Sequence, residues 1–296
     1  MPIDVHQHIW PPDFVELLRA RTAPPHLDGW TLHLEGEPPY EVDPADHDID
    51  ARTRLAGTDG LDLALVSLSS PLGIEHLPPA EALPLLSAFH EGALALPAPF
   101  GVWASPCLSE PDPGAVERDL RRGCVGLQLP ATALLDAAGL RACAPFLDLL
   151  TRLGKPLFVH PGVAPPTPRA PSWWAALVPY QQQSHGAWFA FRAFGRARHP
   201  ELRVCFAALA GLAPMHGERL AARGGGRGEV DFDVFYDTSS YGTRAVDALV
   251  RAVGIDVVVS GSDRPYAHLV IPDLGAEAAV HALRTVNPAR LLHGRS

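Results

Sequence analysis

The stretch that decides the fold is residues 1–10, MPIDVHQHIW, a short apolar run that ends in two histidines, His6 and His8. Side chains alternate between the faces of a β-strand, so both imidazoles project from one face if this run is a strand. Two imidazoles directed at one point form half of a divalent metal site. The alternative is a pair of polar residues at a strand end, so the rest of the chain must supply further ligands.

Apolar runs of this kind recur along the chain and alternate with segments of helical periodicity. The runs are residues 3–9, 63–68, 100–104, 125–129, 156–159, 203–207, 234–236 and 257–260. Largely apolar strands that alternate with helices predict a parallel sheet. Eight such repeats predict an α/β protein with a (β/α)8 TIM barrel, a single domain over residues 1–296. An open doubly wound sheet is the alternative, but no Gly-x-Gly-x-x-Gly follows the first run.

Two connections are too long to be simple turns. Residues 11–43 follow the first strand and contain Trp30, and residues 162–184 follow the fifth and contain Trp173, Trp174 and Tyr180. In a barrel both would lie at the catalytic face, beyond the carboxyl ends of the strands. We therefore expect these aromatic residues to wall a substrate pocket.

Composition excludes several classes of partner. The net charge is −9, and no basic stripe indicates nucleic acid or an anionic membrane. The four cysteines are widely separated, and no signal peptide or membrane span is recognised, so we expect reduced thiols and a cytoplasmic protein. A small-molecule substrate is the expected partner, with a homodimer as the candidate assembly.

Two later strand ends supply further ligand types. His160 ends the fifth strand in PLFVHPG, and Asp263 follows the eighth in VVVSGSDRPY. A closed barrel gathers the ends of strands 1, 5 and 8 around one mouth. Three imidazoles and one carboxylate suit a single divalent ion, for which Zn²⁺ is the first candidate. A helix-capping role is the alternative for His160 and for Asp263.

The chain resembles the amidohydrolase superfamily. More closely, it is similar to the amidohydrolase-related (amidohydrolase 2) branch that holds 2-amino-3-carboxymuconate semialdehyde decarboxylase. The resemblance lies in DVHQHIW at 4–10, VGLQLPA at 125–131, FVHPG at 158–162, SGSDRPY at 260–266 and NPARLLHG at 287–294. It implies a metal bound by His6, His8, His160 and Asp263. Gln128 stands in the strand-4 run where binuclear members carry a carboxylated lysine, which implies one metal rather than two.

One position departs from that family. Its members usually have a histidine at the end of strand 6, where this chain reads VCFAALAGLAP with Ala208 at the matching position. In the decarboxylases that histidine is thought to handle a proton. The sequence therefore favours hydrolysis of a small carboxylated or cyclic ester or amide. The alternatives are non-oxidative decarboxylation of an aromatic or unsaturated acid, and a non-catalytic relative that binds a small ligand.

The predicted hydrolysis assigns roles to further residues. Asp263 would be the catalytic base that takes a proton from a metal-activated water. The candidates for holding the substrate are Arg264, Tyr266, Tyr241, Trp173, Trp174 and Trp30. Asp4 shares the strand face of His6 and could orient a ligand histidine, with a carboxylate bonded to backbone as the alternative.

Overall fold

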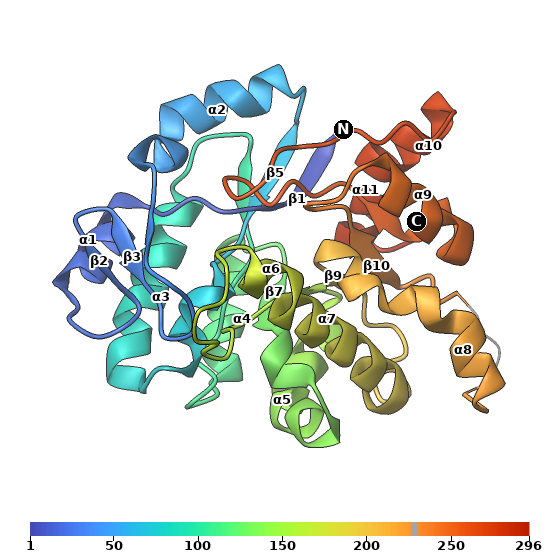
Figure 1. Cartoon of the computed structure of the whole chain (residues 1–296), viewed down its shortest axis with the longest axis horizontal. Coiled ribbons are helices and arrows are strands. Elements are labelled where there is room, and N and C mark those ends of the chain that lie inside the picture. The colour runs from blue at the N-terminus through green and yellow to red at the C-terminus, as the bar shows by residue number, and fades with distance from the viewer. Residues whose placement is uncertain (226–229, 296) are drawn as a thin grey trace.

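The computed structural model describes residues 1–225 and 230–295, and short parallel strands lie at its centre (Figure 1). The strands are β1 (Ile3–Gln7), β5 (Leu63–Val66), β6 (Phe100–Val102), β7 (Leu127–Pro130), β8 (Leu157–His160), β9 (Val204–Phe206), β10 (Val234–Asp237) and β11 (Val258–Val259). They pair in the orders β1-β5-β6 and β11-β10-β9-β8-β7. All eight predicted strands are therefore present.

Backbone hydrogen bonds join the edges of these two sheets. Ala104, just after β6, donates its N–H to the carbonyl of Gly126 at 2.9 Å. On the other side Val5 donates to the carbonyl of Ser260, also at 2.9 Å. The first and the last barrel strands, β1 and β11, are thus neighbours. The parallel strands encircle one core, as expected of a (β/α)8 barrel.

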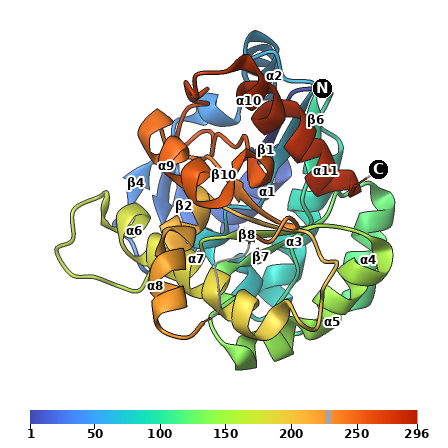
Figure 2. The same cartoon turned by 90° about the vertical axis from the view of Figure 1, so that its right-hand side faces the viewer.

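Helices cover the outside of the strands, as the second view shows (Figure 2). They are α2 (Ile49–Thr58), α3 (Pro79–Leu94), α4 (Pro113–Arg122), α5 (Ala137–Leu153), α7 (Pro179–Ala190), α8 (Gly217–Ala222), α9 (Thr243–Val253), α10 (Glu277–His281) and α11 (Asn287–His293). Aspartates begin three of them, since Asp48, Asp112 and Asp136 accept backbone N–H bonds in the first turns of α2, α4 and α5. No helix among the described residues is both long and apolar enough to cross a bilayer.

The two long connections are more ordered than the sequence suggests. Residues 11–43 contain α1 (Pro12–Ala20) and an antiparallel sheet of β2 (His26–Asp28), β3 (Thr31–His33) and β4 (Tyr40–Glu41). After β8, the chain runs to the short helix α6 (Trp174–Leu177). The periodicity of the sequence predicts a helix over residues 186–199, whereas α7 begins at Pro179. The segment between β3 and β4, residues 34–39, reaches the second connection. A Cβ on Gly36 would lie 1.7 Å from the carbonyl oxygen of Ala164, so the two backbones touch there.

The connection after β9 has an unusual backbone. Residues Ala208, Leu209, Ala210, Gly211 and Leu212 all have φ between 49° and 60°. This is a short left-handed turn, which costs non-glycine residues about 1–2 kcal/mol each. Packing against α7 explains part of it: a Cβ on Gly211 would lie 2.3 Å from the carbonyl oxygen of Gln181.

Candidate metal centre and cavity

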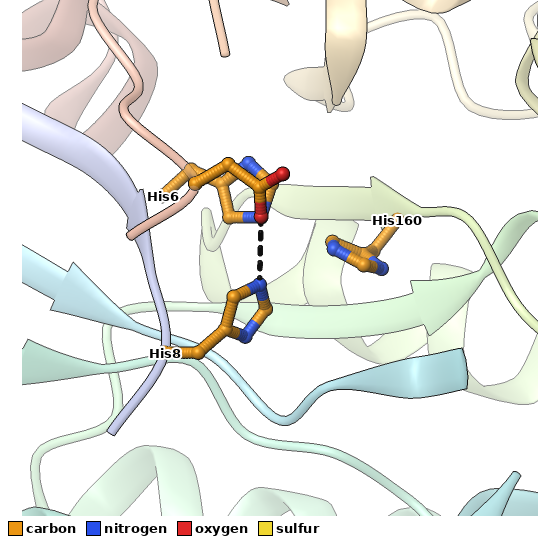
Figure 3. Close-up of side chains that lie close together, drawn as sticks. His6, His8 and His160 are labelled. Atoms are coloured by element: carbon orange, nitrogen blue, oxygen red, sulfur yellow. Dashed lines mark hydrogen bonds and ion pairs between the residues drawn. The ribbon is translucent and has the colours of Figure 1, made fainter. Parts of the chain in front are cut away.

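Four ligand-type side chains meet at the carboxyl ends of the strands (Figure 3). His6 lies near the end of β1 and His8 just beyond it, His160 is the last residue of β8, and Asp263 follows β11. One ligand atom from each lies within 4.8 Å of the others. The structure thus brings together the set that strand ends predict.

The three imidazoles are held through their Nδ1 atoms. Nδ1 of His6 lies 2.7 Å from Oδ2 of Asp237, Nδ1 of His8 lies 2.9 Å from the carbonyl of Ser67, and Nδ1 of His160 lies 2.7 Å from the carbonyl of Pro161. Each partner is an acceptor, so each Nδ1 carries the proton and each Nε2 presents a lone pair. This is how proteins orient histidines that ligate a metal.

These lone pairs face other acceptors. Nε2 of His6 and Nε2 of His8 are 3.1 Å apart, and they lie 3.3 and 3.1 Å from Oδ1 of Asp263. Acceptors directed at one another repel unless a cation lies among them. The donor set therefore fits a divalent metal ion, and its three nitrogens and one carboxylate oxygen suit Zn²⁺ or Mn²⁺.

The site also perturbs the ionisation of its members. Burial, helped by the neighbouring imidazoles of His6 and His8, lowers the pKa of His160 well below its ordinary value. Burial also lowers the pKa of His8. Burial raises the pKa of Asp263, but the three imidazoles that surround it outweigh this effect and lower that pKa. Burial lowers the pKa of His6, but the charges of Asp237 and Asp263 outweigh it and raise that pKa, so His6 would have to lose its proton when a metal binds.

Asp237 is a functional residue that sequence reasoning missed. It is fully buried at the end of β10. Its Oδ2 accepts from His6, and its Oδ1 accepts from the backbone N–H groups of Ala208 and Ser239, each at 2.9 Å. The signal was present, because a carboxylate that ends a barrel strand points to the active face.

Of the two roles considered for Asp4, the structure shows the second, a carboxylate that is hydrogen-bonded to backbone N–H groups. Its Oδ1 accepts from the backbone N–H of His6 at 3.1 Å and of Ser262 at 3.0 Å, while Gln7 donates to its Oδ2 at 2.7 Å. It contacts no ligand ring in these bonds. Asp4 therefore ties β1 to the connection after β11, and Asp237 orients the ligand ring of His6.

A cavity of about 480 Å³ opens above the four ligand-type residues. Much of its wall is apolar and includes Leu32, Leu34, Pro38, Leu72, Pro161 and Leu177. Pockets of this size hold small organic molecules. Of the predicted substrate residues, Tyr241 and Tyr266 line it, and the Tyr266 ring lies 5.4 Å from the His8 ring. Tyr180 lines it as well.

The other predicted substrate residues do not reach the cavity. Arg264 is directed at Asp59, with Nη1 2.5 Å from Oδ2. Trp30 stacks near His47 and beneath Arg19, and Trp173 is 54% exposed beside Trp174. The reason is that a buried guanidinium needs a carboxylate partner, while the indoles pack with their own connections or face solvent.

Ala208 and Gln128 stand where the resemblance places them. Ala208 lines the cavity, so the position that carries a histidine in the family faces the site here. Gln128 is buried on β7 and donates from Nε2 to the carbonyl of Leu68 at 2.8 Å and to Ser70 Oγ at 2.7 Å. An amide held in this way offers no ligand like a carboxylated lysine, which agrees with one metal.

No protein-family model matches the sequence, and no curated protein matches it. Solved structures do match its fold. The IDCase of Metarhizium anisopliae is 17% identical, with a TM-score of 0.75, over 99% of this chain and 97% of that one. The 5-carboxyvanillate decarboxylase of Sphingomonas paucimobilis is 18% identical, with a TM-score of 0.71, over 98% of each chain.

A further similar structure contains a metal. It is a variant of the 5-carboxyvanillate decarboxylase of Novosphingobium aromaticivorans with bound manganese and 3-methoxy-4-hydroxy-5-nitrobenzoic acid. It is 16% identical to this chain, with a TM-score of 0.68, over 95% of this chain and 90% of that one. At these identities the likeness shows a shared fold over nearly the whole chain.

Proposed function

We propose that this protein is a metal-dependent decarboxylase of the amidohydrolase-related branch, acting without oxidation on an aromatic or unsaturated carboxylic acid. The observation that carries the proposal is the set of three Nε2 atoms and one carboxylate oxygen on the floor of a cavity with largely apolar walls. The fold it shares with two 5-carboxyvanillate decarboxylases supports decarboxylation over the hydrolysis that the sequence favoured.

His6, His8, His160 and Asp263 would hold one divalent ion. Zn²⁺ is the first candidate from the ligand types, and Mn²⁺ is the second. Bound there, the ion would neutralise the carboxylate of the substrate and hold it against the cavity floor. Asp237, Ser67 and Pro161 keep the three imidazoles in the tautomer that this requires.

A side chain of this protein would deliver the proton that decarboxylation requires. Decarboxylation breaks the bond between the carboxyl carbon and its neighbour, CO2 leaves, and the electron pair stays on that neighbouring carbon. A proton must then form the new C–H bond. Asp263 accepts from Ser240 Oγ at 3.3 Å, so we assign it the relay of this proton, which it would take up from solvent and pass to the carbon. The apolar walls favour loss of a charged carboxylate because they solvate it poorly.

Hydrolysis is the second candidate, and Ala208 is the observation in its favour. The cavity position that carries a proton-handling histidine in the related decarboxylases has only a methyl group here. A hydrolase would need one metal-activated water and Asp263 as the base, and both roles survive the replacement.

Turnover in oxygen-18 water separates the two reactions. The metal-loaded protein is incubated with aromatic and enoic acids in one series and with cyclic esters and amides in another. Release of CO2 without label in the organic product supports decarboxylation, whereas label in a new carboxylate supports hydrolysis. Asp263→Asn should lower kcat by about 10²–10⁴-fold in either reaction. Metal-dependent binding without turnover would support the non-catalytic alternative.

A further inference from the structure

A cluster of polar side chains lines the cavity above the ligand residues. The hydroxyl of Tyr180 donates to Oε1 of Glu37. The hydroxyl of Tyr266 lies 3.3 Å from Ser69 Oγ, and Tyr40 lines the same cavity. All five side chains line the same cavity as His8. The cluster therefore offers a carboxylate and three phenols to the part of a substrate that does not react.

The position of Glu37 is set by the backbone on which it lies. Gly36 touches the carbonyl of Ala164, so the segment between β3 and β4 rests on the connection after β8. Tyr180, at the start of α7, then meets Glu37 from that second connection. The side chain of Glu37 is partly buried, and burial raises its pKa.

Apart from the three imidazoles on the cavity floor, no basic side chain among the described lining residues balances Glu37. Among the described residues that line it there is no arginine or lysine, and the carboxyl groups are those of Glu37 and Asp263. The two buried arginines near β1 have other partners. Arg52 donates to the carbonyls of His8 and Asp46, and Arg264 pairs with Asp59. A second carboxylate on a substrate would therefore meet Glu37 without a counter-charge.

We propose that Glu37 is the specificity-determining residue of this cavity. It selects ring acids that carry one carboxylate and, away from it, a hydrogen-bond donor such as an amino or hydroxyl group, and it excludes dicarboxylic acids. The inference rests on the proposed function, which places the reacting carboxylate at the His/Asp floor. Like charges brought together in a site suppress the wrong partner, while a charged acceptor favours a donor.

Calorimetric titration of the metal-loaded protein tests this independently of turnover. The ligands are 3- and 4-aminobenzoate, 3- and 4-hydroxybenzoate, and the benzene-1,3- and benzene-1,4-dicarboxylates. We expect the best amino or hydroxy acid to bind at least about 10-fold more tightly than either dicarboxylate. In Glu37→Gln the preference should fall below about 3-fold, because the amide no longer repels the second carboxylate. Glu37→Lys should reverse it.

Glu35→Gln is the matched control, because Glu35 is exposed two residues earlier and lies outside this cavity. It should keep the preference of the unmodified protein. Equal binding of all six acids, or a preference that survives in Glu37→Gln, would overturn the role of Glu37 while leaving decarboxylation intact. If none of the acids binds, both the inference and the proposed substrate class are wrong.

Discussion

Asp237 shows how much a single residue does at this site. Its two carboxylate oxygens join the Nδ1–H of His6 to the backbone N–H groups of Ala208 and Ser239, so one buried side chain connects β1 to the connections after β9 and β10. Removing such a partner leaves the ligand in place but frees its ring to turn or to change tautomer.

Asp237→Asn should therefore weaken metal binding without abolishing it. We expect a loss of about 10–100-fold in affinity, measured by competition with a coloured chelator. His160→Ala removes a ligand and should reduce the metal content well below one equivalent, as elemental analysis would show. His281→Ala, on α10 and outside the site, is the control. Full affinity in Asp237→Asn would show that His6 needs no partner for its ring.

Which site residues could be predicted from the sequence depends on whether a local pattern marks them. His6, His8, His160 and Asp263 could be found because each follows an apolar run, and barrel strands present their ends to one face. Arg264 faces Asp59 rather than the cavity, and the sequence could not predict this because Asp59 lies about 200 residues away in the chain and no local pattern links the two. The indoles of Trp30 and Trp173 were assigned from their connections alone, which does not show which way a side chain points.

At the scale of elements, the segment between β3 and β4 depends on its contact with the second connection. Gly36→Ala would place a methyl group onto the carbonyl of Ala164, so the segment must move away. We expect the free energy of unfolding to fall by about 1–3 kcal/mol and benzoate affinity to fall with it. Gly57→Ala is the control, since nothing lies near a Cβ there and alanine favours helix α2 by about 0.5–1 kcal/mol. Unchanged benzoate affinity in Gly36→Ala would disprove that this segment shapes the cavity.

The left-handed turn after β9 is an element that the sequence could not reveal. Alanine and leucine disfavour positive φ, and the packing against α7 and the bond from Ala208 to Asp237 help to hold the turn. The periodicity of the sequence predicts a helix over residues 213–223, whereas α8 begins only at Gly217, after this turn.

Ala208→His tests whether this turn presents its first residue to the cavity. Histidine tolerates positive φ better than most residues, and the added ring would enter open space. We expect a folded variant whose free energy of unfolding, measured in urea, changes by less than about 1 kcal/mol. Ala210→His shares the backbone conformation but is fully buried, so it should lose at least about 3 kcal/mol. If both variants lose stability equally, Ala208 belongs to the core.

For the whole molecule, the order of apolar runs was enough to predict the barrel, because eight strands alternating with helices have few other arrangements. Closure of the barrel depends on contacts between its first and its last strand–helix units. Arg264, after β11, is buried against Asp59 at the end of α2, and Arg284 donates to the carbonyl of Asp59 at 2.7 Å. These contacts hold the last unit of the barrel to the first.

Asp59→Ala should consequently destabilise the whole barrel. The substitution leaves the guanidinium of Arg264 buried without a counter-charge. Removing one partner of a buried ion pair lowers the free energy of unfolding by about 3–5 kcal/mol. The loss should appear as one cooperative shift of the urea midpoint, because the contact joins the first and last units of one barrel. Asp247→Ala breaks an exposed pair with Arg251 on α9 and should leave the midpoint unchanged. A separate early transition in Asp59→Ala would mean that the last unit unfolds by itself and that closure does not limit the stability of the barrel.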